Sequence, residues 1–244
     1  MRTLADERIM DELSGLSPEL LLKWSHQHHG DRAAIFTSFQ NTGCLMIDMS
    51  HRVAPGLRVI TVDTGRLHRE TYELIDTIEK RYGLTIERIH PDPESVKRMI
   101  ERHGEYLFFD NVAKQEYCCK IRKVDPNQRA LKTVSVWITG LRRDHGKSRE
   151  DTARAAFVEQ DGRQILKLCP LADWSEERVW QYIRENDVPY NQLYGKGYTS
   201  IGCEICTTPT LPSEARRAGR WRWINQADPD HHKECGIHTD GSGI

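Results

Sequence analysis

The chain has 244 residues, enough for one large domain, and its hydrophobic content of 38% supports an ordinary buried core. Its formal net charge is -1, although basic side chains cluster in two stretches, residues 142–149 and 216–222. A nearly neutral chain with basic loops suits a small anionic ligand better than a long nucleic acid, which usually needs a basic face. We therefore expect no nucleic-acid partner.

The sequence also predicts a protein that does not enter a membrane. No apolar run reaches the roughly 18 residues of a membrane-spanning helix. The stretch from Met1 to Arg8 lacks the apolar centre of a signal peptide. Seven cysteines in a chain without an export signal do not suggest a disulfide framework, because thiols stay reduced in the cytoplasm. We therefore expect a cytoplasmic protein.

Predicted strands and helices alternate along most of the chain. Buried apolar runs predict strands at residues 33–38, 57–63, 84–89, 134–139 and 165–169. Helical apolar spacing predicts helices at residues 16–29, 44–52, 68–82 and 93–102. A further helix is expected after Ser175, a capping residue followed by two glutamates. This alternation predicts a doubly wound, mostly parallel α/β sheet.

Polar loops that contain glycine follow three of these strands, at residues 38–43, 63–68 and 139–144. Ligands of such sheets bind beyond the carboxyl ends of the strands, so we expect the loops to meet around a ligand. The turn at Ser38 and Phe39 can present backbone N–H groups to a phosphate. It is not a Walker loop, because no Gly-Lys-Ser/Thr follows.

The cysteines are the strongest chemical signal. Four of them form two tight pairs, Cys118-Cys119 and Cys203-Glu-Ile-Cys206. Four thiolates brought together can bind a [4Fe–4S] cluster or a tetrahedral zinc ion, and unliganded thiols are a third alternative. Adjacent cysteines favour the cluster, because it offers each thiolate a separate iron, whereas two neighbouring sulfurs chelate one ion with difficulty.

The remaining cysteines have different surroundings. Cys44 and Cys169 have no motif partners, and we expect them to be ordinary buried thiols. Cys235 stands alone in a tail that contains several glycines, three residues before His238. A lone thiol beside a histidine is a candidate nucleophile.

Five motifs, in family order over about residues 33–238, give the chain a resemblance to known enzymes. They are Val62-Asp-Thr-Gly-Arg-Leu-His68, Glu116-Tyr-Cys-Cys-Lys-Ile-Arg-Lys123, Ile138-Thr-Gly-Leu-Arg-Arg-Asp144, Gly197-Tyr-Thr-Ser-Ile-Gly-Cys-Glu-Ile-Cys206 and Lys233-Glu-Cys-Gly-Ile-His238. Together they resemble the assimilatory adenylyl-sulfate (APS) and phosphoadenylyl-sulfate (PAPS) reductases. The cysteine pairs mark the iron–sulfur branch of that family, which mostly uses APS.

The resemblance implies an adenine nucleotide alpha hydrolase-like sheet of the PP-loop type. It also implies thioredoxin-dependent reduction of APS to sulfite and AMP, in sulfate assimilation and cysteine biosynthesis. The implied cofactor is one [4Fe–4S] cluster, held by Cys118, Cys119, Cys203 and Cys206. The implied partners are APS and, as reductant, thioredoxin or glutaredoxin. A homo-oligomer is left open.

Site residues follow from the same resemblance. Cys235 is the implied nucleophile, which would carry a Cys–S–SO₃⁻ adduct that thioredoxin releases as sulfite. The implied substrate-binding residues are Ser38, Phe39, Asp63, Thr64, Gly65, Lys123, Gly140, Arg142, Arg217, Arg220 and His238. The cations among them would neutralise the oxygens that repel an approaching thiolate. The alternative for the arginines is a solvated loop face, and for His238 a solvated tail.

The resemblance implies three parts of the chain: an N-terminal helical segment (residues 1–30), an α/β nucleotide-binding and cluster domain (31–225) and a flexible catalytic tail (226–244).

One loop departs from the family pattern. Gly43 and Cys44 stand where iron–sulfur members usually carry an acidic pair. We therefore expect APS as the preferred substrate with secondary use of PAPS, because carboxylates near the ribose would repel a 3′-phosphate.

Two other functions compete with this interpretation. One is a PP-loop enzyme that uses ATP, such as a ligase or a tRNA-thiolating enzyme. Such enzymes need a Ser-Gly-Gly-x-Asp-Ser type of loop, and the sequence Ser38-Phe-Gln-Asn-Thr-Gly43 argues against it. The other is a non-catalytic binding module stabilised by zinc, which would be colourless where a cluster protein is brown.

Overall fold

The computed structural model of the protein describes residues 4–146 and 149–227. Six strands form one sheet in the order β3-β2-β1-β4-β6-β5. Their bounds are β1 Ala33–Phe36, β2 Arg58–Val62, β3 Ile86–Ile89, β4 Val136–Thr139, β5 Ala155–Gln160 and β6 Arg163–Leu168. Every neighbouring pair is parallel except β5 and β6. The predicted mostly parallel α/β sheet is confirmed.

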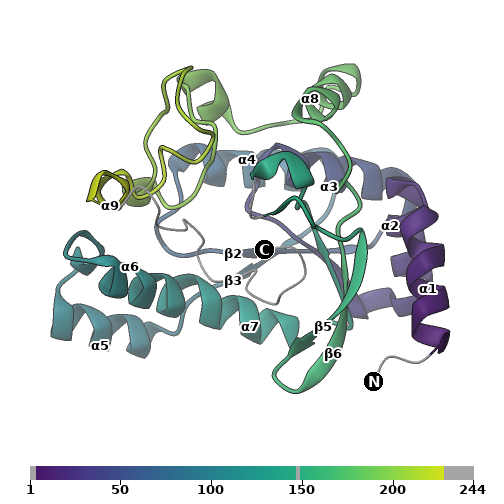
Figure 1. Cartoon of the computed structure of the whole chain (residues 1–244), viewed down its shortest axis with the longest axis horizontal. Coiled ribbons are helices and arrows are strands. Elements are labelled where there is room, and N and C mark those ends of the chain that lie inside the picture. The colour runs from purple at the N-terminus through teal and green to yellow at the C-terminus, as the bar shows by residue number, and fades with distance from the viewer. Residues whose placement is uncertain (1–3, 147–148, 228–244) are drawn as a thin grey trace.

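Helices cover both faces of this sheet (Figure 1). Their bounds are α1 Leu4–Gly15, α2 Pro18–His29, α3 Asn41–Val53, α4 Arg69–Tyr82, α5 Pro93–His103, α6 Val112–Cys119, α7 Asp125–Leu131, α8 Glu176–Glu185 and α9 Arg222–Ala227. None of the helices within the described ranges is both long and apolar enough to span a membrane.

Alternation along the strands divides the core into two layers. Ile35 and Ile138 face the side on which α1, α2, α3, α4 and α8 pack. Ala34, Ile60 and Trp137 face the opposite side, where α7 packs. A third cluster, around α5, α6 and α9, includes Cys118, Cys206 and Trp221. The four paired cysteines therefore belong to a smaller packed unit beside the main sheet.

Most predicted elements are confirmed with shifted ends. β1 stops at Phe36 because the next residues form a turn in which Phe39 has a φ of 55°. Ser175 caps α8 as predicted, since its Oγ accepts a hydrogen bond from the backbone N–H of Arg178 (3.2 Å). The structure adds β5, an edge strand in which only Ala155 and Val158 are buried.

The structure also adds α6 and α7, joined by a π-helical turn over Lys120–Val124. Apolar periodicity does not reveal this segment, because its buried positions include Gln115, Cys118 and Arg122 rather than an apolar stripe. A π-helical turn inside a helix is rare and frequently lies at a functional site.

A buried carboxylate fixes α3 relative to its neighbours. Asp48, 3% exposed, accepts hydrogen bonds from Tyr82 of α4 (3.0 Å) and Tyr182 of α8 (2.8 Å). Arg52 supplies the balancing charge at 3.0 Å. Burial, together with Asp48, raises the pKa of both tyrosines, so each remains a hydrogen-bond donor. This network holds the helix whose N-terminus faces the carboxyl edge of the sheet.

Candidate functional site

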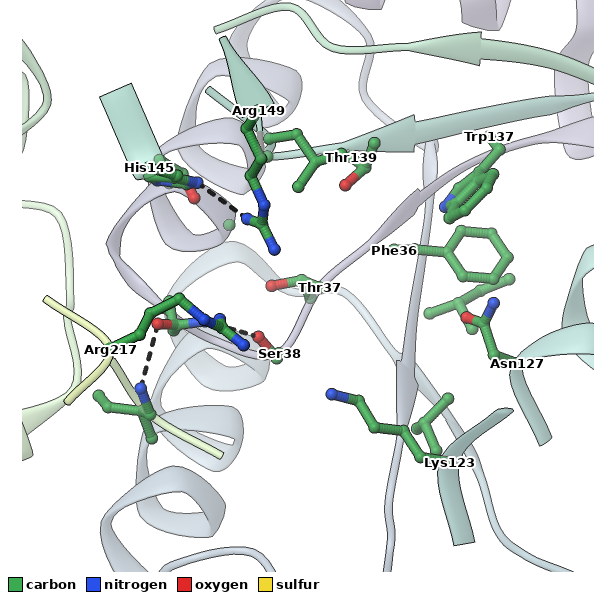
Figure 2. Close-up of a pocket in the computed structure, with 18 of the residues that line it drawn as sticks. Phe36, Thr37, Ser38, Lys123, Asn127, Trp137, Thr139, His145, Arg149 and Arg217 are labelled. Carbon is green, nitrogen blue, oxygen red and sulfur yellow. Dashed lines mark hydrogen bonds between the residues drawn. The ribbon is translucent and has the colours of Figure 1, made fainter. Parts of the chain in front are cut away.

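A cavity lies beyond the carboxyl ends of β1, β2 and β4, where the sequence predicts ligand binding (Figure 2). The loop after β1 contributes Thr37 and Ser38, β2 contributes Val62, and the loop after β4 contributes Gly140. The α3 N-terminus closes this side, and its helix dipole favours a bound anion, while the N–H groups of Asn41, Thr42 and Gly43 already have hydrogen-bond acceptors within the protein. Three chain segments far apart in the sequence therefore build one pocket.

The two ends of this cavity differ in chemistry, as Figure 2 shows. We call them the aromatic end, lined by Phe36, Ile60, Val62, Asn127 and Trp137, and the basic end, lined by Ser38, Lys123, His145, Arg149, Arg217 and Arg220. A ligand with a flat apolar part and an anionic part matches this division.

Side-chain hydrogen bonds hold the loop after β1 in place. Thr37 Oγ1 accepts from the backbone N–H of Phe39 at 2.9 Å, and Phe39 itself is fully buried. The amide of Gln40 donates to Ser38 Oγ (3.3 Å) and accepts from the backbone N–H of Ile201 (3.1 Å). Ser38 thus lies on the cavity wall, whereas Phe39 packs in the core, and a substrate contact by either residue stays a prediction.

Gly43 and Cys44, at the positions where the resemblance leads us to expect an acidic pair, are constrained by packing. A Cβ atom at Gly43 would lie 2.0 Å from Thr37 Oγ1, so a side chain at this position displaces the loop. Cys44 is fully buried, and burial raises the pKa of its thiol to about 12. Cys169 is 1% exposed. Cys44 and Cys169 are therefore buried thiols, as predicted.

In the Asp63-Thr64-Gly65 segment, the side chain of Asp63 stabilises the turn that the segment forms. Asp63 Oδ1 accepts from the backbone N–H of Gly65 and from Tyr72 OH, both at 2.8 Å. Thr64 lines a second cavity, where its Oγ1 lies 3.3 Å from Cys203 Sγ. Neither Asp63 nor Gly65 lines the first cavity. Ligand contact by this segment stays a prediction.

The second cavity is lined by both cysteine pairs, Cys118-Cys119 from α6 and Cys203 and Cys206 from the loop before α9. All four are free thiols. Burial raises the pKa of Cys118, against the opposing effect of Arg66 and Arg122, and raises that of Cys206 to about 12. Within the described ranges, no group of three or more His, Cys, Asp or Glu side chains is arranged to hold one metal ion.

Five residues line both cavities: Ser38, Val62, Lys123, Ile201 and Arg220. Arg220 is 5% exposed and lies with its guanidinium 4.7 Å from the centre of the Trp221 ring. A Cβ atom at Gly202 would lie 2.2 Å from its Nη1, so only glycine leaves room for this arginine. Two cations predicted at the site, Lys123 and Arg220, therefore form the partition between the cavities.

Arg142 lies behind the wall of the first cavity rather than in it. Its side chain has no exposed surface and forms ion pairs with Asp144 (2.9 Å) and with Glu176. Arg149 takes a place in the wall instead. The geometry gives Arg142 a supporting position, so a direct substrate contact remains only a prediction from the resemblance.

Glu176 connects three parts of the site, although the sequence suggested only a role at the start of α8. One oxygen, Oε1, accepts from Asn41 Nδ2 at the α3 N-terminus (2.9 Å). The other, Oε2, accepts from Arg142 and from Arg216 (2.6 Å). Burial alone would raise the pKa of Glu176, but Arg216 and Arg142 outweigh it and hold the pKa below its ordinary value. Glu176 is therefore a carboxylate that joins both basic loops to α3.

His145 is a second residue that sequence reasoning missed. Arg149 Nη1 lies 3.2 Å from its Nδ1, and because a guanidinium can only donate, Nδ1 must accept (Figure 2). The ring proton is then on Nε2. Burial and the charges of Arg216, Arg142, Arg149 and Arg217 lower the pKa of His145 well below its ordinary value. The basic end thus contains a neutral imidazole.

Comparison with known proteins decides the family. Residues 32–209 match the model of the phosphoadenosine phosphosulfate reductase domain. The chain belongs to this family. It is 37% identical over 238 residues to the adenosine 5′-phosphosulfate reductase of Pseudomonas aeruginosa (strain LESB58), covering 95% of this chain and 85% of the relative.

Solved structures agree with the assignment of this chain to the phosphoadenosine phosphosulfate reductase domain family. The phosphoadenylyl-sulfate (PAPS) reductase of Candida auris has a TM-score of 0.71 and 29% identity, over 85% of this chain and 98% of that chain. The FMN adenylyltransferase of Candida glabrata, 12% identical with a TM-score of 0.55, covers 88% of this chain and 70% of its own and shares the fold alone. Cys235 and His238 lie outside the described residues.

We predict that Glu176→Gln destabilises the protein. Loss of the carboxylate leaves buried Arg142 with Asp144 alone, so the free energy of unfolding should fall by about 1–3 kcal/mol in urea titrations. Glu177→Gln is a matched control, because Glu177 is exposed in the same helical turn, and it should change stability by less than about 0.5 kcal/mol. Equal effects of the two substitutions would contradict the joining role of Glu176.

The neutral His145 predicts a pH dependence of stability. The pKa of His145 is held below its ordinary value of 6.5 in the folded chain, so the unfolded chain binds this proton more readily. Its contribution to stability is complete above pH 6.5 and is lost as the pH falls below 6.5. At about pH 5.5 the loss relative to His145→Gln should reach about 1.4 kcal/mol. Thermal unfolding of wild type and His145→Gln, at about pH 5.5 and at a pH above 6.5, measures this loss of stability. An equal loss of stability in the two proteins would disprove the role of His145.

Proposed function

We propose that the chain is an oxidoreductase that reduces adenosine 5′-phosphosulfate to sulfite and AMP in sulfate assimilation. The observation that carries the proposal is the cavity with an aromatic and a basic end at the carboxyl edge of the sheet. An adenine base suits the aromatic end, and the phosphate and sulfuryl oxygens suit the basic end. Family membership and the names of the relatives support the same substrate class.

The cations of the basic end explain how a thiolate could approach the substrate. The sulfuryl sulfur is surrounded by anionic oxygens that repel a negative nucleophile. Lys123, Arg217 and Arg220 line the cavity where those oxygens would lie, and arginine forks bind two oxygens at once. Neutralisation at fixed positions lowers the barrier without reorganisation during the reaction.

Cys235 is the proposed nucleophile. Its thiolate would attack the sulfuryl sulfur, the bond from sulfur to the bridging oxygen would break, and AMP would leave with the electron pair. The Cys–S–SO₃⁻ adduct then needs two electrons from a dithiol, for which we propose thioredoxin or glutaredoxin. One reductant thiol attacks the Cys235 sulfur and releases sulfite, and the second thiol resolves the mixed disulfide.

We further propose that the second cavity holds a [4Fe–4S] cluster. Its four free cysteines fit this group, and Arg66, Arg122, Lys123 and Arg220 in the same wall would balance its negative charge. The adjacent pair Cys118-Cys119 suits a cofactor that offers a separate metal atom to each thiolate, because two neighbouring sulfurs chelate one ion with difficulty. When bound, the cluster would link two distant chain segments and add negative charge beside the substrate cations.

The preference for APS over PAPS is tested by sulfite release from both substrates, with thioredoxin supplied. No carboxylate lines the described wall of the first cavity, which favours some tolerance of a 3′-phosphate. We expect a higher kcat/KM for APS and measurable turnover of PAPS. A protein that prefers PAPS would contradict the assignment to APS, and one that releases no sulfite from either would overturn the proposed reaction.

Cys235→Ser should lower turnover by at least about 10³-fold while leaving the cluster absorbance near 400 nm unchanged, because the tail cysteine is not among the four cavity thiols. Wild-type protein given APS without reductant should gain a sulfonate on Cys235, detected by mass spectrometry. A sulfonate on another cysteine, or a fully active serine variant, would refute the assignment.

Cys118→Ser and Cys203→Ser should each remove the brown colour and lower stability, because each breaks a cross-link between segments about 85 residues apart. Cys169→Ala is the matched control, since Cys169 is a buried thiol that does not line the second cavity, and it should keep its iron. Metal analysis of anaerobically prepared protein decides the outcome. One zinc and almost no iron would show that the site is a zinc site.

A further inference from the structure

The aromatic end of the first cavity is a fixed surface for a flat ring. Trp137 of β4 is fully buried, and Lys167 Nζ of β6 lies 4.6 Å from the centre of its ring. Phe36 of β1 meets Trp137 edge-on, with ring centres 6.1 Å apart. Ile60 and Val62 complete the apolar wall. Such a surface binds an aromatic base through its faces and edges but does not tell one base from another.

One polar side chain, Asn127, interrupts this apolar surface. Asn127 belongs to the first turn of α7 and is 5% exposed, yet it lines the cavity. Within the described residues its side-chain amide has no hydrogen-bond partner. Figure 2 shows the amide near Phe36 and Trp137, away from the arginines of the basic end. The amide atoms are not among the buried atoms that lack a partner, so they are accessible from the cavity, where a ligand can pair with both the donor and the acceptor.

We propose that Asn127 recognises the base of the nucleotide and makes the aromatic end selective for adenine. The inference rests on the proposed function, because it takes the ligand to be an adenine nucleotide. The amide oxygen would accept a hydrogen bond from the 6-amino group, and the amide N–H would donate to the adjacent ring nitrogen. This donor and acceptor pair is the one by which asparagine reads adenine in nucleic acids. Asn127 is thus a specificity-determining residue, separate from the cations that bind the anionic part.

The test compares two nucleotides in two proteins. AMP carries the 6-amino group, whereas purine riboside 5′-monophosphate lacks it and is otherwise the same. Calorimetry should show that the wild type binds AMP about 5- to 100-fold more tightly than the analogue. In Asn127→Leu, of similar volume but without polar atoms, the ratio should fall to less than about twofold. Gln128→Leu, an exposed neighbour on α7, should keep the wild-type ratio.

The outcomes separate this inference from the proposed reaction. If Asn127→Leu keeps the full preference for AMP, or if wild type binds neither nucleotide, the role of Asn127 is refuted, whatever the sulfite assay shows. If the preference disappears in the variant but no sulfite is released from APS by wild type, base recognition stands and the reaction fails. Asn127→Asp, which keeps an acceptor oxygen and loses the donor, provides the same comparison if the leucine variant does not fold, and its ratio should be intermediate.

Discussion

Positive charge gathered around one cavity is the constraint on which the rest of the site depends. Lys123, Arg149, Arg217 and Arg220 line a wall that has no carboxylate among its described residues. Like charges held this close repel one another, and burial removes much of the water that would screen them. The carboxylate of Glu176 lies behind the wall, where it pairs with Arg142 and Arg216 of the two basic loops rather than with the cations that line the cavity. The wall is therefore left complementary to an anion.

The same constraint explains why α3 and α8 are tied together. Glu176 accepts a hydrogen bond from Asn41 at the α3 N-terminus while it pairs with arginines of both basic loops. Farther along α3, Asp48 accepts a hydrogen bond from Tyr182 of α8 and another from Tyr82 of α4. The helix dipole, the arginines and the loop after β1 thus act on the cavity as one preorganised unit. A substitution that breaks any one of these contacts is therefore expected to alter the geometry of the others.

The two cavities share a wall, which joins the proposed cofactor site to the proposed substrate site. Lys123 and Arg220 lie between them, and Thr64 links the loop after β2 to Cys203. Any negative charge in the cysteine cavity would act directly on cations that also face the first cavity. The π-helical turn after Cys119 contributes to this arrangement, because the turn places Lys123 at the partition between the cavities.

The sequence by itself determined the sheet, the loops at its carboxyl edge, the four paired cysteines and most of the cations, because periodicity and motifs are local signals. Tertiary structure decided which side chains face the cavity. Arg142 and Arg149 belong to the same basic stretch, yet only Arg149 lines the wall, because Arg142 pairs with Glu176, a residue 34 positions away in the chain. Asn127 gave no local signal either, since its importance comes from Phe36 and Trp137, which only the folded sheet brings beside it.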